Sequence, residues 1–176
     1  MVALEAFVET LAAARVGRTY NQYAEGPRAA LLRHRLASYL ALRWDAPILL
    51  VGEAPGYRGA RVSGIPFTSE RQLTGAGPAE ATATIVHRTL RELDLEDGVL
   101  LWNVVPTHPG TKCSNRRPTA EEVEAGRRFT EFLARSRRVI PVGRIAERAL
   151  GIAGVRHPSR GGAKEFRAGL LECTGP

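Results

Sequence analysis

Three short runs of consecutive apolar residues stand out along the chain, over residues 48–51, 99–105 and 139–143. The first follows Pro47 and stops at Gly52, and each run has the length of a strand rather than of a helix. A strand that is apolar at nearly every position is covered on both faces, which is typical of a parallel sheet. We therefore expect three buried strands.

The segments around these runs space their apolar residues as a helix does. Thr119 and Glu122 form a capping box that begins one of these helices. A last short strand is expected over residues 154–156. The pattern predicts further helices over residues 4–15, from Arg28 to about Leu40, from Ala79 to Leu93 and from Gly162 to Leu171.

The alternation of strands and helices places the chain in the α/β class, as an open three-layer α/β/α sandwich with a short, mostly parallel central sheet. The length of 176 residues suits one domain, so we expect a single domain over residues 1–176. In such sheets, ligands bind beyond the carboxyl ends of the strands. Candidate chemistry is therefore expected in the three segments that leave those ends.

The first of these segments is rich in glycine and continues from Gly52 through Tyr57 to Pro66 and Phe67. Glycine lets a backbone approach a ligand closely and exposes its N–H groups. A nucleotide-phosphate loop is not indicated, because neither Gly-x-Gly-x-x-Gly nor a Gly-Lys-Ser/Thr ending is present. Phe67 follows a rigid proline, where its ring could stack on a flat ligand; an ordinary core phenylalanine is the alternative.

The second segment begins at Asn103, a polar residue set in an otherwise apolar strand. An amide is costly to bury unless it finds hydrogen-bond partners. Asn103 could pair with a planar ring that offers one donor beside one acceptor, or it could close the following turn with a structural hydrogen bond. The loop beyond it carries Lys112, Asn115, Arg116 and Arg117, which would also suit a solvated surface.

The third segment reads His157-Pro158-Ser159-Arg160-Gly161-Gly162. A single histidine is most often a structural or exposed residue. His157, however, precedes a predicted helix whose first N–H groups are free to bind a phosphate. Ser159 and Arg160 would add hydrogen-bond donors to the same anion.

Composition adds a hint about the partner. The chain has 25 Lys and Arg against 18 Asp and Glu, a net charge of +7, and 23 of the 25 cations are Arg. Because a guanidinium is planar and pairs well with phosphate, this favours a polyanionic partner such as nucleic acid. A genome-wide coding bias toward Arg would give the same composition.

The remaining composition narrows the class. No apolar run approaches the roughly 20 residues that span a bilayer, and no secretory signal is visible, so we expect a cytoplasmic protein without membrane contact. Cys113 and Cys173 are 60 positions apart and lack Cys-x-x-Cys partners, so a four-cysteine cluster is excluded unless other residues supply ligands. Two free thiols are expected.

Together the three segments resemble the uracil-DNA glycosylase superfamily, over about residues 47–170. The closing motif of the superfamily is similar to His157-Pro158-Ser159. The first motif of the thermostable bacterial branch is similar to Gly52-Glu53-Ala54-Pro55-Gly56 with Gly64-x-Pro66-Phe67, and its second block to Asn103-Val104-Val105 with Asn115-Arg116-Arg117-Pro118-Thr119-x-Glu121-Glu122. The resemblance implies an α/β/α fold and a monofunctional DNA repair enzyme, which flips uracil out of DNA and hydrolyses its N-glycosidic bond to leave an abasic site.

The resemblance also implies roles for single residues. Phe67 would stack on uracil, and Asn103 would read its O4 and N3–H edge and reject cytosine. His157, as a neutral imidazole, would donate to O2 while negative charge develops there. The backbone around Gly52, Glu53, Ala54, Gly56 and Tyr57 would complete the base pocket, and Ser159, Arg160, Gly161, Lys112 and Arg116 would hold DNA phosphates.

Some positions depart from the family pattern. Where the best-known branch has an aspartate that orients the water, this chain has Ala54. Glu53, one residue earlier, is the candidate to replace that aspartate, and it would either orient the water or brace the loop. Where that branch blocks the thymine methyl with an aromatic residue, this chain has Gly56; Tyr57 would take over the exclusion, or the pocket would admit larger bases. The thermostable bacterial branch has four cysteines that hold an iron–sulphur cluster, and this chain lacks them. Where other members have an apolar residue that fills the space left by the flipped base, this chain has Gly161, so that Arg160 could enter that space instead.

Uracil excision from DNA is therefore the predicted function, performed by a monomer without metal or organic cofactor. One alternative is the same chemistry on another lesion, such as hypoxanthine, xanthine or mispaired thymine, because Ala54 and Gly56 would enlarge the pocket. Another is a non-catalytic module that binds damaged DNA, because the usual aspartate is missing. The last is an unrelated α/β protein in which these segments are ordinary turns.

Overall fold

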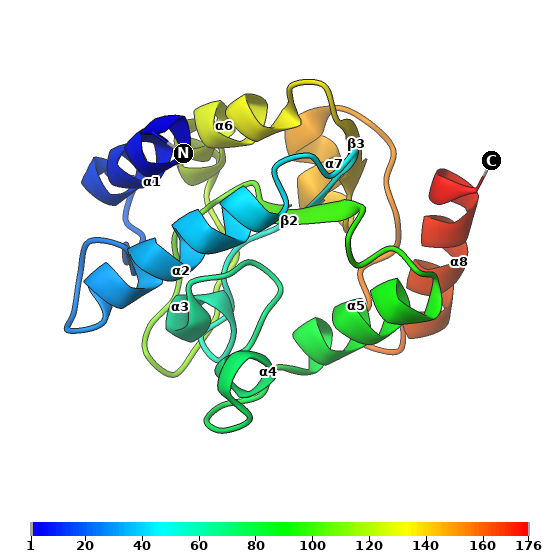
Figure 1. Cartoon of the computed structure of the whole chain (residues 1–176), viewed down its shortest axis with the longest axis horizontal. Helices are drawn as coiled ribbons and strands as arrows, with labels where there is room; N and C mark the ends of the chain where they lie inside the picture. Colours follow the sequence, from blue (N-terminus) through cyan, green and yellow to red (C-terminus); the bar gives the residue numbers. More distant parts are fainter. Residues whose placement is uncertain (1, 176) are drawn as a thin grey trace.

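The computed structural model describes residues 2–175 and contains a three-stranded parallel sheet in the order β2-β1-β3 (Figure 1). The strands are β1 (Ile48–Gly52), β2 (Val99–Asn103) and β3 (Arg138–Pro141). The predicted parallel sheet is confirmed. The expected fourth strand is only a single parallel bridge between Val142 and Val155, so it extends the sheet by one position beside β3.

The helices at the expected places are confirmed, with ends that differ by one to three residues. Three further helices are too short for their spacing to be detected in the sequence: α3 (Ala60–Ser63), α4 (Glu70–Thr74) and α7 (Arg144–Leu150). The longer ones are α1 (Val2–Ala13), α2 (Ala29–Leu42), α5 (Ala81–Glu92), α6 (Ala120–Ala134) and α8 (Ala163–Thr174). The capping box of α6 is present, because the Thr119 side chain accepts from the Glu122 N–H and the Glu122 carboxylate accepts from the Thr119 N–H.

The side chains of β1 alternate between two hydrophobic clusters, one on each face of the sheet. Leu49 and Val51 pack with residues of α1, α2, α6 and α7, whereas Ile48 and Leu50 pack with residues of α5 and α8. Figure 1 shows α1 and α6 together on one side of the sheet and α5 and α8 on the other. The three-layer arrangement follows from this alternation, because successive residues of a strand point to opposite faces.

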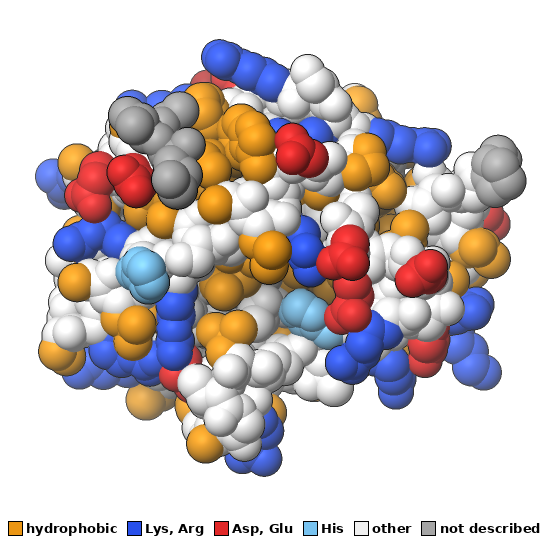
Figure 2. Space-filling model, in the orientation of Figure 1, with side chains coloured by type: hydrophobic (Ala, Val, Ile, Leu, Met, Phe, Trp, Pro, Cys, Tyr) orange, Lys and Arg blue, Asp and Glu red, His pale blue; other side chains and the backbone are white. Residues whose placement is uncertain are grey.

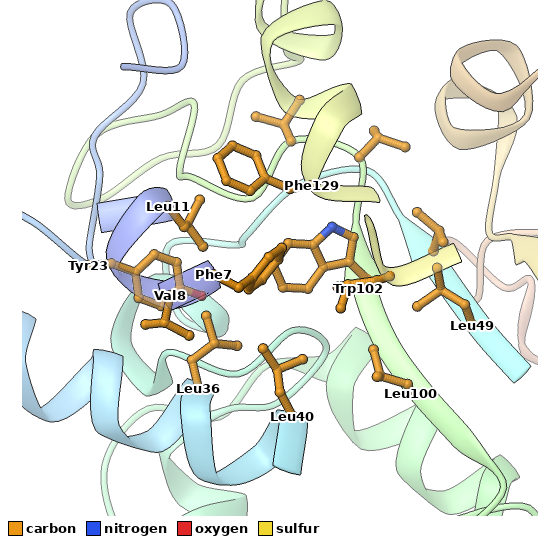
Figure 3. Close-up of a cluster of buried hydrophobic side chains, with 14 of the residues drawn as sticks. Phe7, Val8, Leu11, Tyr23, Leu36, Leu40, Leu49, Leu100, Trp102 and Phe129 are labelled. Carbon is orange, nitrogen blue, oxygen red and sulfur yellow. The ribbon is translucent and has the colours of Figure 1, made fainter. Parts of the chain in front are cut away.

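The larger cluster is built around aromatic rings (Figure 3). Phe7 of α1 lies 5.7 Å from both Trp102 of β2 and Phe129 of α6, measured between ring centroids. These contacts join the first helix, the central sheet and α6. These contacts pack Trp102 of β2 into the core. Asn103 follows Trp102 directly and is the last residue of the strand.

The carboxyl ends of the strands form one edge from which all three glycine- or proline-rich segments depart. Gly52 pairs with Asn103 in the parallel register, and the Val142 N–H donates to the Val51 carbonyl on the other side. Within residues 2–175, no helix is both long enough and apolar enough to cross a membrane.

Candidate base-binding site

Phe67 and Asn103 meet at Gly52. A Cβ atom placed on Gly52 would overlap Cζ of the Phe67 ring, and it would lie 2.8 Å from the ring's Cε2 and 2.9 Å from Oδ1 of Asn103. The ring from the first segment and the amide from the second are therefore neighbours at the carboxyl end of β1. The missing side chain of Gly52 gives both groups their space.

The Asn103 amide is buried but has no protein partner. The residue is 3% exposed, and the hydrogen bonds of residues 2–175 include none to its side chain. The oxygen and nitrogen of this amide are also not fully enclosed, so they retain contact with solvent. The structure thus lacks the turn-closing hydrogen bond that was the alternative interpretation of Asn103, and its donor and acceptor are free for a ligand.

Phe67 has an unusual backbone, with a φ of 52° in the left-handed region. A large residue without special need avoids this conformation, which costs free energy and is concentrated at functional sites. The following residue fixes it: the Thr68 carbonyl accepts from Ser63 Oγ at 2.6 Å, and Thr68 Oγ1 lies 3.0 Å from Nε2 of His87. Phe67 is only 8% exposed and packs within the cluster below the sheet, so it is also part of the core.

His157 lies at the same edge of the sheet, because it follows Val155, which pairs with Val142 just after β3. A Cβ atom on Gly143, which follows β3, would be 3.0 Å from the His157 Cβ. The Ser159 N–H donates to Nδ1 of His157 at 3.2 Å, and the Ser159 hydroxyl lies 2.7 Å from the same nitrogen. Because Nδ1 accepts a backbone N–H, the neutral ring carries its proton on Nε2.

Burial lowers the pKa of His157 below its usual value, and the charge of Arg156 lowers it further. The imidazole is therefore neutral at pH 7 and presents one N–H donor. Nε2 has no hydrogen bond within the described chain and is not fully enclosed. A neutral, preorganised donor of this kind can stabilise an oxygen on which negative charge develops.

The first and second segments are joined by direct contacts. The Val105 N–H donates to the Glu53 carbonyl at 3.1 Å, and the Tyr57 N–H donates to Oδ1 of Asn115 at 2.9 Å. Nδ1 of the fully buried His108 lies 2.7 Å from the Pro55 carbonyl oxygen. These contacts hold the loop that includes Ala54, Gly56 and Tyr57 against the loop that follows Asn103.

Glu53 is half-buried at the start of this loop. Burial raises the pKa of its carboxyl above the usual value, and the positive charge of Arg117 opposes that shift. Arg117 belongs to the second segment, so the predicted basic loop does reach the first one electrostatically. Glu53 thus directly follows Gly52 in the first loop, and its carboxyl is partly compensated by a cation.

The residues expected to hold phosphates lie in different environments. Arg160 and Lys112 are exposed and take part in none of the ion pairs found in residues 2–175, and Gly161 has open space around it. Arg116 donates to both carboxylate oxygens of Glu122, at 2.8 and 2.6 Å, so most of its charge is already compensated. Lys and Arg side chains are spread over the face in Figure 2 rather than gathered in one patch.

One functional candidate was missed by sequence reasoning. Glu80, immediately before α5, places its carboxyl group against Gly56 and Gly59 of the first loop. The only signal in the sequence is its position at a helix start, where Ser, Thr, Asp or Asn would be usual.

Two hollows of about 440 and 510 Å³ lie elsewhere on the surface, beside α6 and around residues 12–25. Neither of them includes Gly52, Asn103 or His157.

The α/β fold, with these candidate residues at the carboxyl ends of its strands, is that of a DNA glycosylase family. Residues 41–171 match the family model of the uracil DNA glycosylase superfamily, and the chain belongs to that superfamily. The type-5 uracil-DNA glycosylase of Thermus thermophilus is 31% identical over 183 aligned residues, which cover 90% of this chain and 78% of the relative. The crystal structure of wild-type Pedobacter heparinus SMUG2 superposes with a TM-score of 0.71 at 14% identity, over 97% of this chain and 96% of that one, which shows the shared fold.

Proposed function

We propose that the protein removes uracil from DNA by hydrolysing its N-glycosidic bond, and that it leaves an abasic site. The observation that carries the proposal is the meeting of Phe67 and Asn103 at Gly52, with the Asn103 amide free of protein partners. A planar base with one acceptor beside one donor would satisfy that amide. Membership of the superfamily and the similarity to a type-5 uracil-DNA glycosylase support the same reading.

In this proposal Phe67 stacks on the extruded uracil, and Asn103 donates to O4 and accepts from N3–H. Cytosine has the opposite pattern of donor and acceptor on that edge, so it would leave the amide unsatisfied. The backbone of Gly52, Ala54, Gly56 and Tyr57 forms the rest of the base pocket. Discrimination therefore comes from one amide, at the carboxyl end of β2.

His157 donates its Nε2–H to O2 of uracil as the glycosidic bond breaks. The cleavage leaves negative charge on uracil, and a neutral donor that is already oriented stabilises it without reorganisation. Ser159 keeps the ring in this tautomer through its N–H and hydroxyl contacts to Nδ1. Glu53 orients the attacking water, and its charge also favours the sugar cation.

DNA is the partner in this proposal, and the protein acts as a monomer. Ser159, Arg160 and Gly161 contact phosphates beside the flipped nucleotide, while Lys112 and the donors of Arg116 that Glu122 leaves open contact the backbone farther along. These contacts would hold the distorted duplex, since extruding a base costs about a few kcal/mol of stacking and pairing. The excess of cations over anions in the chain agrees with such a role.

The test is an oligonucleotide panel with one uracil, hypoxanthine, xanthine, mispaired thymine or normal base per strand, single- and double-stranded, read by strand scission after alkali. Uracil substrates should yield free uracil and an alkali-labile site. Asn103→Ala and His157→Ala should each slow the single-turnover rate by about 100-fold or more, because each removes a positioned hydrogen-bonding group. Tight binding to uracil DNA without any release of uracil would indicate a non-catalytic binding module. Faster release of a purine than of uracil would indicate that the purine lesion, and not uracil, is the substrate.

A further inference from the structure

The turn that carries Phe67 has an unusual residue for its shape. Pro66 and Phe67 are its two central residues, and the Thr68 N–H donates to the Ile65 carbonyl at 3.2 Å to close it. A turn with proline at the first central position and a positive φ at the second matches type II, which usually has glycine or asparagine at the second position. Here that residue is Phe67, with a φ of 52°. The backbone disfavours a large side chain at this position, so other contacts must hold the turn.

Part of this support comes from a buried hydroxyl group in the same segment. Ser63 is 0% exposed, and its Oγ donates to the Thr68 carbonyl at 2.6 Å and accepts from the Ile65 N–H at 3.1 Å. These two contacts connect the residues on either side of the Pro66–Phe67 pair. They fix the ends of the turn, and a further contact to the Thr68 side chain comes from α5.

That contact is made by His87 of α5. Its Nε2 lies 3.0 Å from Oγ1 of Thr68, which is 3% exposed. The Thr68 hydroxyl has one proton, and it donates that proton to the Pro66 carbonyl at 3.1 Å. The hydroxyl oxygen therefore accepts from His87, and the proton of the neutral imidazole is on Nε2.

The surroundings of His87 suit a donor that points into the protein. A quarter of its side chain is exposed, and its Nδ1 lies 4.0 Å from Oε1 of Glu96, which is too long for a hydrogen bond. Burial lowers the pKa of His87, while the charge of Glu96 and a hydrogen bond to the Phe67 backbone oppose that shift. His87 thus interacts with both Phe67 and the residue after it.

A second hydrogen bond holds α5 against the same segment. Nε2 of Gln72 donates to the Ala83 carbonyl at 3.2 Å, and Ala83 lies one helical turn before His87. On its other side α5 packs Val86 and Leu90 into the hydrophobic cluster below the sheet. The position of the His87 donor relative to the sheet is therefore set by the core.

We propose that His87 is a positioning residue for base stacking, an inference that rests on the proposed function. Its Nε2–H holds Oγ1 of Thr68 and thereby keeps Phe67 in the left-handed conformation. In that conformation the ring lies at Gly52, beside the Asn103 amide. Without this hydrogen bond the turn relaxes toward a negative φ, and the ring leaves its place at Gly52.

The experiment measures single-turnover release of uracil from an oligonucleotide by wild type, His87→Phe, His87→Gln and Thr68→Val. His87→Phe keeps a flat ring without the donor, whereas glutamine can place an amide N–H where Nε2 lies. We expect His87→Phe and Thr68→Val to be about tenfold slower, because the stacking ring is displaced. His87→Gln should stay within about threefold of wild type, because it keeps the hydrogen bond. The control is His34→Phe on α2, an exposed histidine, which should match wild type.

A Phe67→Ala background distinguishes positioning from general destabilisation. No ring remains to be positioned there, so His87→Phe should change the rate by less than about twofold, although it should lower the melting temperature in both backgrounds. An equal loss of rate in both backgrounds would overturn the role of His87, and so would a rate for His87→Phe close to that of wild type. Thr68→Val changes the other partner of the same hydrogen bond and replaces His87→Phe if that variant does not fold.

A crystal structure of His87→Phe tests the positioning without any activity. The φ of Phe67 should become negative and the ring should move away from Gly52; an unchanged φ and ring position would overturn the inference. Failure of the wild-type protein to release uracil would reject the proposed function, and the φ of Phe67 in the variant would still show whether His87 holds the turn.

Discussion

The ring of Phe67 occupies the space that a side chain at Gly52 would fill. A Cβ atom there would overlap Cζ of the ring and lie 2.8 Å from Cε2. Both residues border the Asn103 amide, so the ring, the glycine and the amide fix one another's positions at the end of β1. The geometry of the candidate site therefore depends on the absence of a single methyl group.

Replacing Gly52 by Ala should displace the Phe67 ring and inactivate the protein. The added methyl meets a ring and an amide in a packed region, which costs about 1–3 kcal/mol of stability, and the ring leaves the plane in which it would stack on the base. A uracil-release assay and a thermal melt report the two effects separately. Gly98→Ala is the control, because its added Cβ would lie 3.8 Å from the Leu95 carbonyl oxygen, an ordinary contact. Equal uracil release by wild type and Gly52→Ala would remove Phe67 from the site.

Asn103→Ala should abolish base discrimination while leaving the fold nearly unchanged in stability. The amide has no protein hydrogen bond to lose, so we expect the free energy of unfolding to change by less than about 1 kcal/mol. Denaturant unfolding measures this directly. A loss of several kcal/mol would mean that the side chain has a structural partner, and it would restore the alternative in which Asn103 serves the turn.

Much of this site was accessible from the sequence because each signal was local. Continuous apolar runs predicted strands covered on both faces, and an amide within such a run marked Asn103 as costly to bury. The parallel arrangement of the strands then brings Asn103 and Gly52 to one edge, since the carboxyl ends of neighbouring strands meet there. The strand order and the bridge at Val155 required the structure.

What the sequence did not reveal arises from packing between distant segments. Glu80 and Gly56 are 24 positions apart, and their contact depends on how the start of α5 lies against the first loop. Arg116 reads as a phosphate ligand in the sequence, yet the structure pairs it with Glu122 at the start of α6. A carboxylate that is buried by tertiary contacts gives no local pattern, so neither pairing could be predicted.

Acidification should destabilise the wild-type protein partly through His157. Its pKa is lowered in the folded state, so the unfolded chain takes up a proton at about pH 6.5 while the folded chain does not. Stability is therefore full above that pH and declines as the pH falls from 6.5 toward the lowered pKa. His157→Asn should lose less melting temperature than wild type between pH 7.5 and 5.5. Part of the decline should persist in the variant, because burial also lowers the pKa of His87.

Arg116→Leu should destabilise the fold more than it weakens DNA binding. Glu122 is 1% exposed, and it accepts two hydrogen bonds from Arg116 and others from the N–H groups of Thr119 and Arg18. Removing the cation leaves a buried carboxylate with only backbone donors, at a cost of about 2 kcal/mol, or roughly 4–8 °C in melting temperature for a chain of this size.

Arg127→Leu is the matched control for Arg116→Leu, because it breaks the exposed pair with Glu124, for which we expect less than about 1 kcal/mol. The difference between the two variants should shrink at acid pH. The pKa of Glu122 is held below its usual value chiefly by Arg116, so its contribution is present above the usual pKa and is lost as the pH falls through the lowered one. Equal melting temperatures for the two variants at pH 7 would show that Glu122 does not depend on Arg116, and Arg116 would then be available to bind phosphate.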